Sequence, residues 1–287
     1  MSDFQPQRRN HASLRDYRRE RQSSRAPIPP RAPGDARRWL YGTHAVAAAL
    51  ANPERRWRQL AVLAGREEEA KALVAGGRAT WHGRGEAVRV LEHNGFAAIL
   101  PAGAVHQGLA LEVEPLPARS LDDVLPIADT PVGRSIILAL DHVSDPQNIG
   151  AVLRSAAAFG ALAILVSAHG MPAATGVLAK AASGALELVP LVRVVNLARA
   201  LDRLKGEGFW ICGLDATAPS SLAQLQLGDR IGLVLGSEGG GMRRLVRERC
   251  DFLARLPTQR GQPTLNVANA AAVALYELVR GARFPGA

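Results

Sequence analysis

Residues 134–160 read RSIILALDHVSDPQNIGAVLRSAAAFG, which joins a buried-strand pattern to a polar turn and a helical pattern. Residues 136–140 are continuously aliphatic, as in a strand that is covered on both faces of its sheet. Residues 141–148 have turn and helix-cap chemistry, and residues 149–159 resume with helical spacing. Ligands of open α/β sheets bind at such junctions, beyond the carboxyl ends of the strands.

One basic residue interrupts the apolar pattern of the predicted helix. Arg154 follows Asn148 by six positions, so its guanidinium lies within two turns of the helix start and can reach back over the loop. Taken alone, the segment fits a proline-containing loop with an ordinary surface arginine equally well. A ligand site and a plain surface turn therefore both remain open at this point.

The composition indicates one or two soluble domains. A chain of 287 residues is long enough to bury a substantial core. Its apolar runs stay well below the roughly 20 residues that a membrane span needs, and no signal-peptide pattern is found, so we expect a cytoplasmic protein without membrane contact. Cys212 and Cys250 have neither CxxC spacing nor neighbouring histidines, so neither a disulfide scaffold nor a metal site is indicated.

Positive charge is concentrated at the beginning of the chain. Residues 1–38 hold ten arginines and four acidic residues, a net charge of +6 out of +9 for the whole sequence. This stretch is rich in proline and poor in large apolar residues, which predicts a basic disordered tail. Such a tail suits RNA, because neutralised phosphates release counterions, although an inert solvated extension is the alternative. The acidic residues argue against a mitochondrial transit peptide.

The sequence after the tail is typical of a small α/β domain over residues 39–115. Helices are expected at residues 46–50, 66–74 and 86–92, and strands at residues 60–63 and 109–113. About 75 residues are enough for an independent domain. A proline-containing stretch, residues 116–133, is predicted to be a linker.

Strands and helices alternate again over residues 134–287. Strands are expected at residues 136–140, 162–166, 188–192, 210–214 and 231–235, and helices at residues 175–182, 197–205, 243–250 and 267–279. This alternation, with long apolar strands, predicts a parallel sheet covered by helices on both faces.

A glycine-rich loop follows the strand expected at residues 231–235. Residues 233–242 read LVLGSEGGGM, and the glycines permit positive φ and close approach of a ligand to main-chain amides. The spacing matches neither a P-loop nor a dinucleotide fingerprint. Glu238 would repel a phosphate, whereas it can orient a hydroxyl, an amine or Arg154. The loop alone is compatible with a purely structural turn.

A third polar loop precedes the last helix. Residues 256–277 read LPTQRGQPTLNVANAAAVALYE, in which Thr264 or Asn266 can cap the helix. The alanine-rich face allows close helix packing, in the core or across a dimer. Three polar loops at such junctions can converge on one site, which favours an enzyme over a scaffold.

Three short sequence motifs follow one another along the chain. They are DPQNIGA at residues 145–151 with Arg154, LGSEG at 235–239 with Gly241 and Met242, and Leu256-Pro257 with LNV at 265–267 and LYE at 275–277. With these motifs the chain resembles the SpoU/TrmH family of the SPOUT superfamily, S-adenosylmethionine-dependent RNA ribose 2′-O-methyltransferases. YGTHAV at residues 41–46 and HQG at 106–108 resemble the L30e-like RNA-binding domain of the subgroup that methylates a guanosine of 23S ribosomal RNA.

The resemblance implies an α/β fold in which a parallel-sheet SPOUT catalytic domain, residues 134–287, follows a small L30e-like RNA-binding domain, residues 39–115. It also implies a C-terminal trefoil knot, which general rules of chain topology would reject. A homodimer with its site near the subunit interface, S-adenosyl-L-methionine as cofactor, and 23S rRNA as partner are further implications.

The resemblance also assigns roles to individual residues. Gly236, Leu256 and Leu265 would hold the methyl donor, largely through backbone groups. The catalytic set would comprise Arg154, Asn148, Glu238, Asn266 and Thr264. Because the donor's sulfonium is already activated, the protein must mainly align oxygen, methyl group and sulfur. An arginine normally stays protonated, so we expect Arg154 to bind the adjacent phosphate and stabilise developing alkoxide charge.

The third motif departs from the family pattern at three positions. Thr264 replaces a serine but keeps a hydroxyl, Arg260 stands at a usual glycine, and Ala268 replaces a serine. Two other functions therefore remain open: a transfer RNA ribose methylase of the same family, and a non-catalytic RNA-binding protein of ribosome assembly with the same fold. Affinity for S-adenosylmethionine separates the last from the enzymes.

Overall fold

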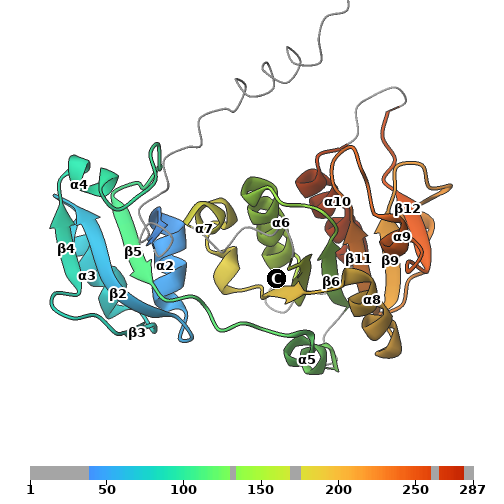
Figure 1. The fold of residues 1–287 in the computed structure, drawn as a ribbon, viewed down its shortest axis with the longest axis horizontal. Helices are drawn as coiled ribbons and strands as arrows, with labels where there is room; N and C mark the ends of the chain where they lie inside the picture. The colour runs from blue at the N-terminus through green and yellow to red at the C-terminus, as the bar shows by residue number, and fades with distance from the viewer. Residues whose placement is uncertain (1–38, 130–133, 169–175, 260–264, 281–287) are drawn as a thin grey trace, which may run out of the picture. The chain divides into compact units, whose positions relative to one another are not determined.

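The computed structural model describes residues 39–129, 134–168, 176–259 and 265–280 (Figure 1). The basic tail predicted for residues 1–38 lies outside these residues. Within them the chain builds two β-sheets, one of five strands and one of seven. None of the described helices is both long enough and apolar enough to cross a membrane.

The first sheet has the order β1-β5-β2-β3, and β4 pairs with β2 beside β3. Its strands are β1 (Trp39–Tyr41), β2 (Arg56–Leu63), β3 (Thr80–Trp81), β4 (Val88–Leu91) and β5 (Leu109–Val113), and its helices are α2 (Thr43–Ala51), α3 (Glu67–Ala75) and α4 (His93–Ala97). We call residues 39–115 the N-terminal module. Alternate residues of its strands enter two apolar clusters, so both faces of the sheet are covered.

The helix expected at residues 86–92 is wrong, because residues 88–91 form the strand β4. This strand runs parallel to β2, with Leu60 opposite Val88. The sequence VRVL alternates β-branched and other residues, which favours a strand, and the neighbouring edge of β2 supplies hydrogen-bond partners. A helix begins only at His93.

The second sheet is entirely parallel, with the strand order β10-β12-β9-β11-β6-β7-β8. Its strands are β6 (Ser135–Leu140), β7 (Ala163–Ser167), β8 (Leu191–Val194), β9 (Trp210–Leu214), β10 (Ser220–Ser221), β11 (Arg230–Leu235) and β12 (Phe252–Arg255). Its helices are α5 (Leu121–Val124), α6 (Pro146–Ala158), α7 (Gly176–Ala182), α8 (Leu197–Gly206), α9 (Arg244–Arg247) and α10 (Val267–Val279), with short 3₁₀ turns η2 (Leu125–Asp129), η3 (Ala185–Glu187) and η4 (Leu222–Gln224).

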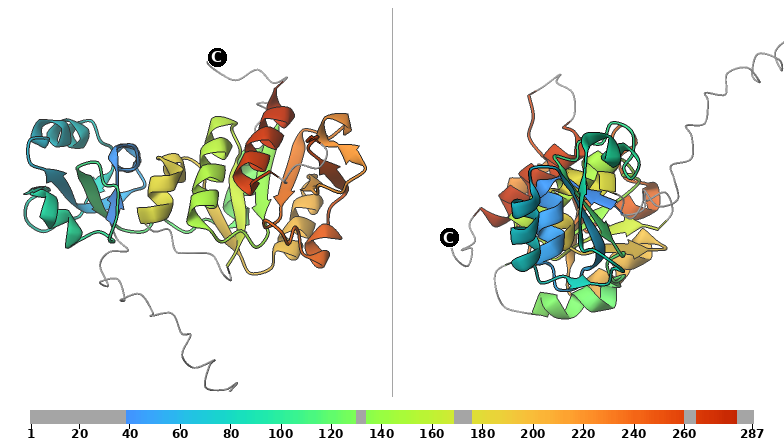
Figure 2. Two further views of the ribbon diagram at one scale, coloured as in Figure 1. Left: turned by 90° about the horizontal axis from the view of Figure 1, so that it is seen from above. Right: turned by 90° about the vertical axis from the view of Figure 1, so that its left-hand side faces the viewer.

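Helices cover both faces of this sheet, as the sequence predicts. Along β6, Ile136, Leu138 and Leu140 join a buried cluster with residues of α6, α7 and α10. Ile137 and Ala139 point the other way, into a cluster with residues of α5, α8 and α9. Figure 2 shows α7, α6 and α10 in a row on one side of the strands.

Helices α6 and α7 approach each other closely because one residue lacks a side chain. A Cβ added to Gly150 would lie 2.4 Å from Cβ of Ala181.

The start of α6 is fixed by Asp145, whose carboxylate accepts a hydrogen bond of 3.1 Å from Gln147 N, and by Pro146 in the first helical turn.

Several boundaries differ from the predicted ones. Strand β12 was not expected, and β8 occupies residues 191–194 instead of the predicted 188–192. Helix α9 is shorter than expected. The stretch expected to be a linker contains α5 and η2, whose Val124 packs into the core of the second sheet.

Candidate active site

The three polar loops leave the same edge of the seven-stranded sheet. Strands β6 and β11 are parallel neighbours and end opposite each other, with Leu235 paired to Leu140. Strand β12 lies in the same parallel set, two strands from β11. The loops that begin at Asp141, Gly236 and Leu256 therefore emerge together, at the edge where α/β proteins bind ligands.

Three predicted catalytic residues, one from each loop, meet in a hydrogen-bonded cluster. Glu238 Oε1 accepts hydrogen bonds from Asn148 Nδ2 at 3.2 Å and from Asn266 Nδ2 at 2.6 Å. Asn266 Nδ2 also donates to Asn148 Oδ1 at 3.0 Å. The backbone N–H of Val267 approaches the same Glu238 oxygen at 3.4 Å. Residues 118 positions apart in sequence thus converge as expected.

Two of the three cluster residues lie at helix starts, and the third, Glu238, lies in the glycine-rich loop after β11. Asn266 is the N-cap of α10, and its Oδ1 accepts a hydrogen bond of 2.8 Å from Ala268 N, so the predicted cap is confirmed. Asn148 lies in the first turn of α6. Thr264 and Arg260 lie outside the described residues, so the roles expected for them stay predictions.

Arg154 does not join the cluster within one chain. Among the residues that the structure describes it has no hydrogen bond or ion pair, and its side chain is exposed. Six residues of helix separate Arg154 from Asn148, about 9 Å along the axis, which is a reason why one chain shows no contact between Arg154 and Glu238. The guanidinium is available to an external anion.

The glycine-rich loop folds into a tight turn that depends on its glycines. Ser237 and Gly241 exchange backbone hydrogen bonds of 3.1 and 2.9 Å. A Cβ at Gly236 would lie 2.1 Å from the carbonyl carbon of Gly241, which leaves no room for a side chain. Gly239 and Gly241 have φ values of 80° and 62°, which other residues rarely adopt.

A buried carboxylate connects the first loop to the second and was not predicted from the sequence. Asp141, 0% exposed, accepts hydrogen bonds from Arg243 N at 2.7 Å and from Arg243 Nε at 2.8 Å. Arg243 Nη2 lies 2.7 Å from Asp141 Oδ1. An aspartate directly after a buried strand was the available signal. This ion pair fixes the end of the glycine-rich loop beside the loop that carries Asn148.

The two leucines expected at the donor site lie beside these loops. Leu256 follows β12 and packs, partly buried, against the main core. Leu265, which precedes the cap residue of α10, is 38% exposed. At the carboxyl edge of the seven-stranded sheet, the backbone groups of Gly236 therefore lie near apolar side chains. Binding of a methyl donor by these three residues stays a prediction.

Comparison with known proteins identifies the family. The model of the SpoU rRNA Methylase family matches residues 135–276. The 23S rRNA (guanosine-2′-O-)-methyltransferase RlmB of Pseudomonas aeruginosa is 38% identical over 241 residues, which are 84% of this chain and 95% of that protein. This chain belongs to the SpoU rRNA methylase family. RlmB of Escherichia coli K12 is also 38% identical, over 253 residues that are 84% of this chain and 97% of the relative.

Solved structures agree with this SpoU assignment at the level of the fold. The SpoU methyltransferase AviRb from Streptomyces viridochromogenes, in complex with AdoMet, has a TM-score of 0.69 and 23% identity, and the match covers 85% of this chain and 91% of AviRb. A putative RNA methyltransferase of the TrmH family from Porphyromonas gingivalis has a TM-score of 0.64 and 26% identity, covering 84% and 89%.

Neither a metal cluster nor an activated thiol is found in the described part of this SpoU family member. No group of three or more His, Cys, Asp or Glu residues there is arranged to hold a metal ion. Burial raises the pKa of the Cys212 thiol to about 12, and burial likewise raises that of Cys250 to about 12. Both thiols are therefore protonated at neutral pH, which suits packing rather than nucleophilic chemistry.

Proposed function

We propose that this chain transfers a methyl group from S-adenosyl-L-methionine to the ribose 2′-hydroxyl of a guanosine in 23S rRNA. The observation that carries the proposal is the cluster of Asn148, Glu238 and Asn266 at the carboxyl edge of the parallel sheet. Two relatives named for this activity match along nearly their whole length, which supports the substrate.

The residues at the sheet edge fit a methyl donor that is held mainly through backbone groups. A Cβ added at Gly239 or Gly241 would meet nothing within 4 Å, so the outer side of this turn is open to a ligand. Gly236, Leu256 and Leu265 would supply main-chain groups and apolar surface to the donor. When bound, S-adenosyl-L-methionine supplies a methyl group that its sulfonium charge already activates.

The chain's own residues then have to orient the ribose and stabilise charge. Arg154, exposed and without a partner among the described residues, binds the phosphate next to the target ribose and stabilises the developing oxyanion. It is not the base, because a guanidinium stays protonated. The proton of the 2′-hydroxyl would pass to solvent water at the open edge as the oxygen takes up the methyl group. Asn148, Glu238 and Asn266 orient groups at the edge by hydrogen bonds, and the Thr264 hydroxyl assists in positioning the substrate.

A homodimer would complete this site. Because Arg154 has no partner among the described residues of its own chain, a second copy can place it against the cluster. Helix α10 exposes Val273 and Tyr276. The ring centroid of Tyr276 lies 6.2 Å from that of Phe159, which follows α6, and these side chains provide an apolar surface for a partner. The dimer is thus an integral part of the proposed mechanism.

The finer fold assignments support the same function. We propose a C-terminal trefoil knot in the SPOUT domain, residues 134–287, because α10 returns to contact loops that follow both β6 and β11. The N-terminal module would be an L30e-like RNA-binding domain, and residues 116–133 its connection. A cytoplasmic location would follow from a ribosomal RNA substrate.

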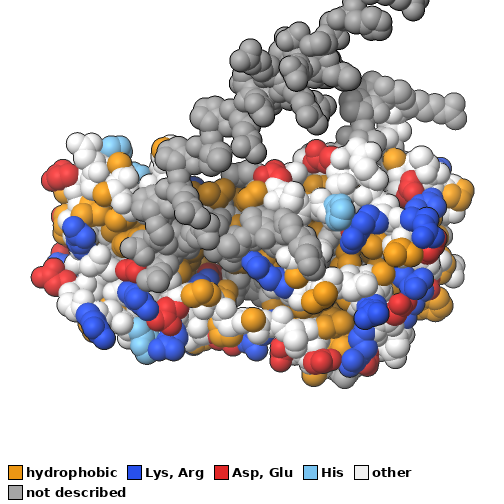
Figure 3. All heavy atoms as spheres, in the orientation of Figure 1, with side chains coloured by type: hydrophobic (Ala, Val, Ile, Leu, Met, Phe, Trp, Pro, Cys, Tyr) orange, Lys and Arg blue, Asp and Glu red, His pale blue; other side chains and the backbone are white. Residues whose placement is uncertain are grey.

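Basic surface next to the site suits an RNA partner. Figure 3 shows Lys and Arg side chains gathered over the part of the molecule that contains α8 and α9. Arg243, Arg244 and Arg247 lie there with exposed side chains. Each of the three has an acidic neighbour, since Arg243 pairs with Asp141, Arg244 with Glu248 and Arg247 with Asp215. The guanidinium groups are nevertheless exposed, so RNA phosphates can contact them from the solvent side.

The test is methylation of 23S rRNA that was isolated from cells lacking this protein. The purified chain should transfer labelled methyl from S-adenosylmethionine to one guanosine, which then resists alkaline cleavage at its 3′ side. Glu238→Ala, which removes the acceptor of both asparagine amides, should lower the single-turnover rate about a hundredfold, as loss of one preorganised polar contact does. Asp122→Asn, which alters an exposed ion pair with Arg203, should not change the rate.

Three outcomes would contradict the proposal. Label found only on transfer RNA would favour the transfer RNA methylase. Label on a base rather than a ribose would exclude 2′-O transfer. No affinity for S-adenosylmethionine in calorimetry would favour a non-catalytic RNA-binding protein.

A further inference from the structure

A buried ion pair joins the N-terminal module to the seven-stranded part of the chain. Arg55, just before β2, pairs through Nη2 with Glu187 Oε1, at the end of η3. Arg55 Nε also donates to Glu187 Oε2 at 3.2 Å. The two side chains are only 4% and 3% exposed, so this contact differs from an ordinary surface pair.

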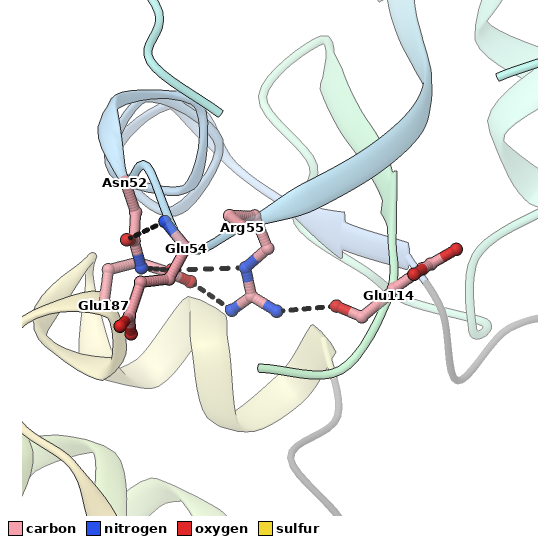
Figure 4. A network of polar contacts seen from close by, with 5 residues as sticks. All are labelled: Asn52, Glu54, Arg55, Glu114 and Glu187. Atoms are coloured by element: carbon pink, nitrogen blue, oxygen red, sulfur yellow. Dashed lines mark hydrogen bonds and ion pairs between the residues drawn. The ribbon is translucent and has the colours of Figure 1, made fainter. Parts of the chain in front are cut away.

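Two further groups complete the polar network that Figure 4 shows. Asn52 Nδ2 donates to Glu187 Oε2 at 2.8 Å, and Arg55 Nη1 donates to the backbone oxygen of Glu114 at 2.9 Å. Glu187 is thus bonded by residues after α2 and before β2, and Arg55 is bonded by the end of β5. A buried charge pair with this many partners is costly to break, because each partner alone would leave an uncompensated charge.

The same segment of the chain makes close backbone contacts with the module. We call residues 176–187 the docking segment. A Cβ added to Gly176 would lie 2.3 Å from Trp39 O, and one added to Gly184 would lie 2.8 Å from Ala48 Cβ. Lys180 of the same segment donates a hydrogen bond to Gln107 Oε1. The docking segment is therefore fitted to the module along its whole length.

The docking segment also touches the helix that carries the candidate site. Gly150 of α6 packs against Ala181, where an added Cβ would approach to 2.4 Å. Asn148, a member of the catalytic cluster, lies two residues before Gly150. A short packed path therefore leads from the Arg55–Glu187 pair, through α7, to the start of α6.

We infer that Arg55 and Glu187 are positioning residues. Their ion pair holds the N-terminal module against the docking segment, so that RNA bound by the module lies at a fixed distance from the catalytic cluster. The inference rests on the proposed function and goes beyond it, because the proposed methyl transfer uses neither of these two residues. Without this ion pair the chain still connects the module to the rest of the protein, but RNA bound by the module is no longer held at a fixed distance from the catalytic cluster.

The expected effect concerns RNA and not the methyl donor. The donor loops follow β11 and β12, whereas the pair lies beside η3. If only about one tenth of the molecules remain docked, the apparent affinity for RNA falls about tenfold. We therefore expect a higher KM for RNA, an unchanged kcat at saturating RNA, and an unchanged affinity for S-adenosylmethionine.

The experiment uses the full chain and a 23S rRNA fragment that the wild type methylates. Arg55→Met and Glu187→Met each leave one buried charge unpaired, and each should raise KM about tenfold and enlarge the radius of gyration in small-angle scattering. The double variant removes both charges and fills the space with apolar side chains, so it should restore KM and compactness. Glu68→Gln alters an exposed pair of the same module and serves as the matched control.

The inference is overturned if either single variant keeps the wild-type KM, or if the double variant is no better than the single ones. Should these single variants fail to fold, Glu187→Gln keeps the size of the side chain and one acceptor oxygen but removes the charge that pairs with Arg55, and a KM for RNA that stays at the wild-type value would then reject the inference. A wild type that methylates no RNA would refute the proposed function instead, while scattering on the single and double variants would still decide whether the pair holds the module.

Discussion

Asp141→Asn tests whether the buried carboxylate organises the methyl-donor loop. The substitution keeps the size of the side chain and removes its charge. Asp141 is completely buried and is bonded to Arg243 by its backbone N–H and by two guanidinium nitrogens, at 2.7, 2.8 and 2.7 Å. Asparagine offers only one acceptor oxygen and turns an NH₂ group toward the other donors, so at least one of these contacts is lost.

The size of the effect follows from the burial of the two partners. Removing one partner of a fully buried pair costs about 3–5 kcal/mol. Arg243 is 47% exposed and can be rehydrated, so a loss of about 2–3 kcal/mol in the free energy of unfolding is expected here. For a chain of this size that loss corresponds to a drop of about 4–12 °C in Tm.

Two measurements check this expectation. Denaturant unfolding gives the stability, and calorimetry gives the affinity for S-adenosylmethionine, which should fall about tenfold as the loop loses its anchor, a loss of about 1.4 kcal/mol. Asp202→Asn is the matched control, since its pair with Arg249 is half exposed on both sides and should contribute under about 1 kcal/mol. The reasoning fails if Asp141→Asn is no more damaging than the control.

Three other substitutions or treatments probe the site and the core. Gly236→Ala places a Cβ 2.1 Å from the carbonyl carbon of Gly241, so calorimetry should show loss of donor binding in a chain that still folds. Arg154→Lys keeps the charge but loses the planar guanidinium; the single-turnover rate should fall about a hundredfold with RNA binding intact, and a near-wild-type rate would contradict the role. Because burial raises the pKa of Cys212 and Cys250 to about 12, only about one thiol in ten thousand is ionised at pH 8, and alkylation followed by mass spectrometry should be far slower in native than in unfolded protein.

Elements with strong local patterns were predictable from the sequence. Strands β5 and β9 and helix α10 have the predicted bounds, because their apolar residues follow a period that only one type of structure can bury. Strands β4 and β12 were missed. Each has only four residues, and their strand character depends on the neighbours β2 and β9, which lie far away in the sequence.

The candidate site was predictable where topology decides the geometry. Three polar loops were expected to converge because parallel strands end at one edge, and the family resemblance grouped Asn148, Glu238 and Asn266; the structure brings these three side chains into hydrogen-bond contact. The Asp141–Arg243 pair was not predicted, since 102 positions separate its members and only Asp141, directly after a buried strand, gave a local signal. The role of Arg154 stays a prediction: its motif was recognised, and one chain gives it no partner among the described residues.

The two buried carboxylates, Asp141 and Glu187, are expected to affect different binding steps, and experiments can measure the two effects separately. Asp141 anchors the loop at the donor side, and Glu187 anchors the module expected to bind RNA. If the two anchors act independently, Asp141→Asn should change affinity for S-adenosylmethionine without changing RNA affinity, and Glu187→Met should do the reverse. Their effects on the free energies should then be additive in the double variant, because the contacts share no residue. Strong non-additivity would instead mean that the path through α7 and α6 couples the donor loop to the RNA-binding module.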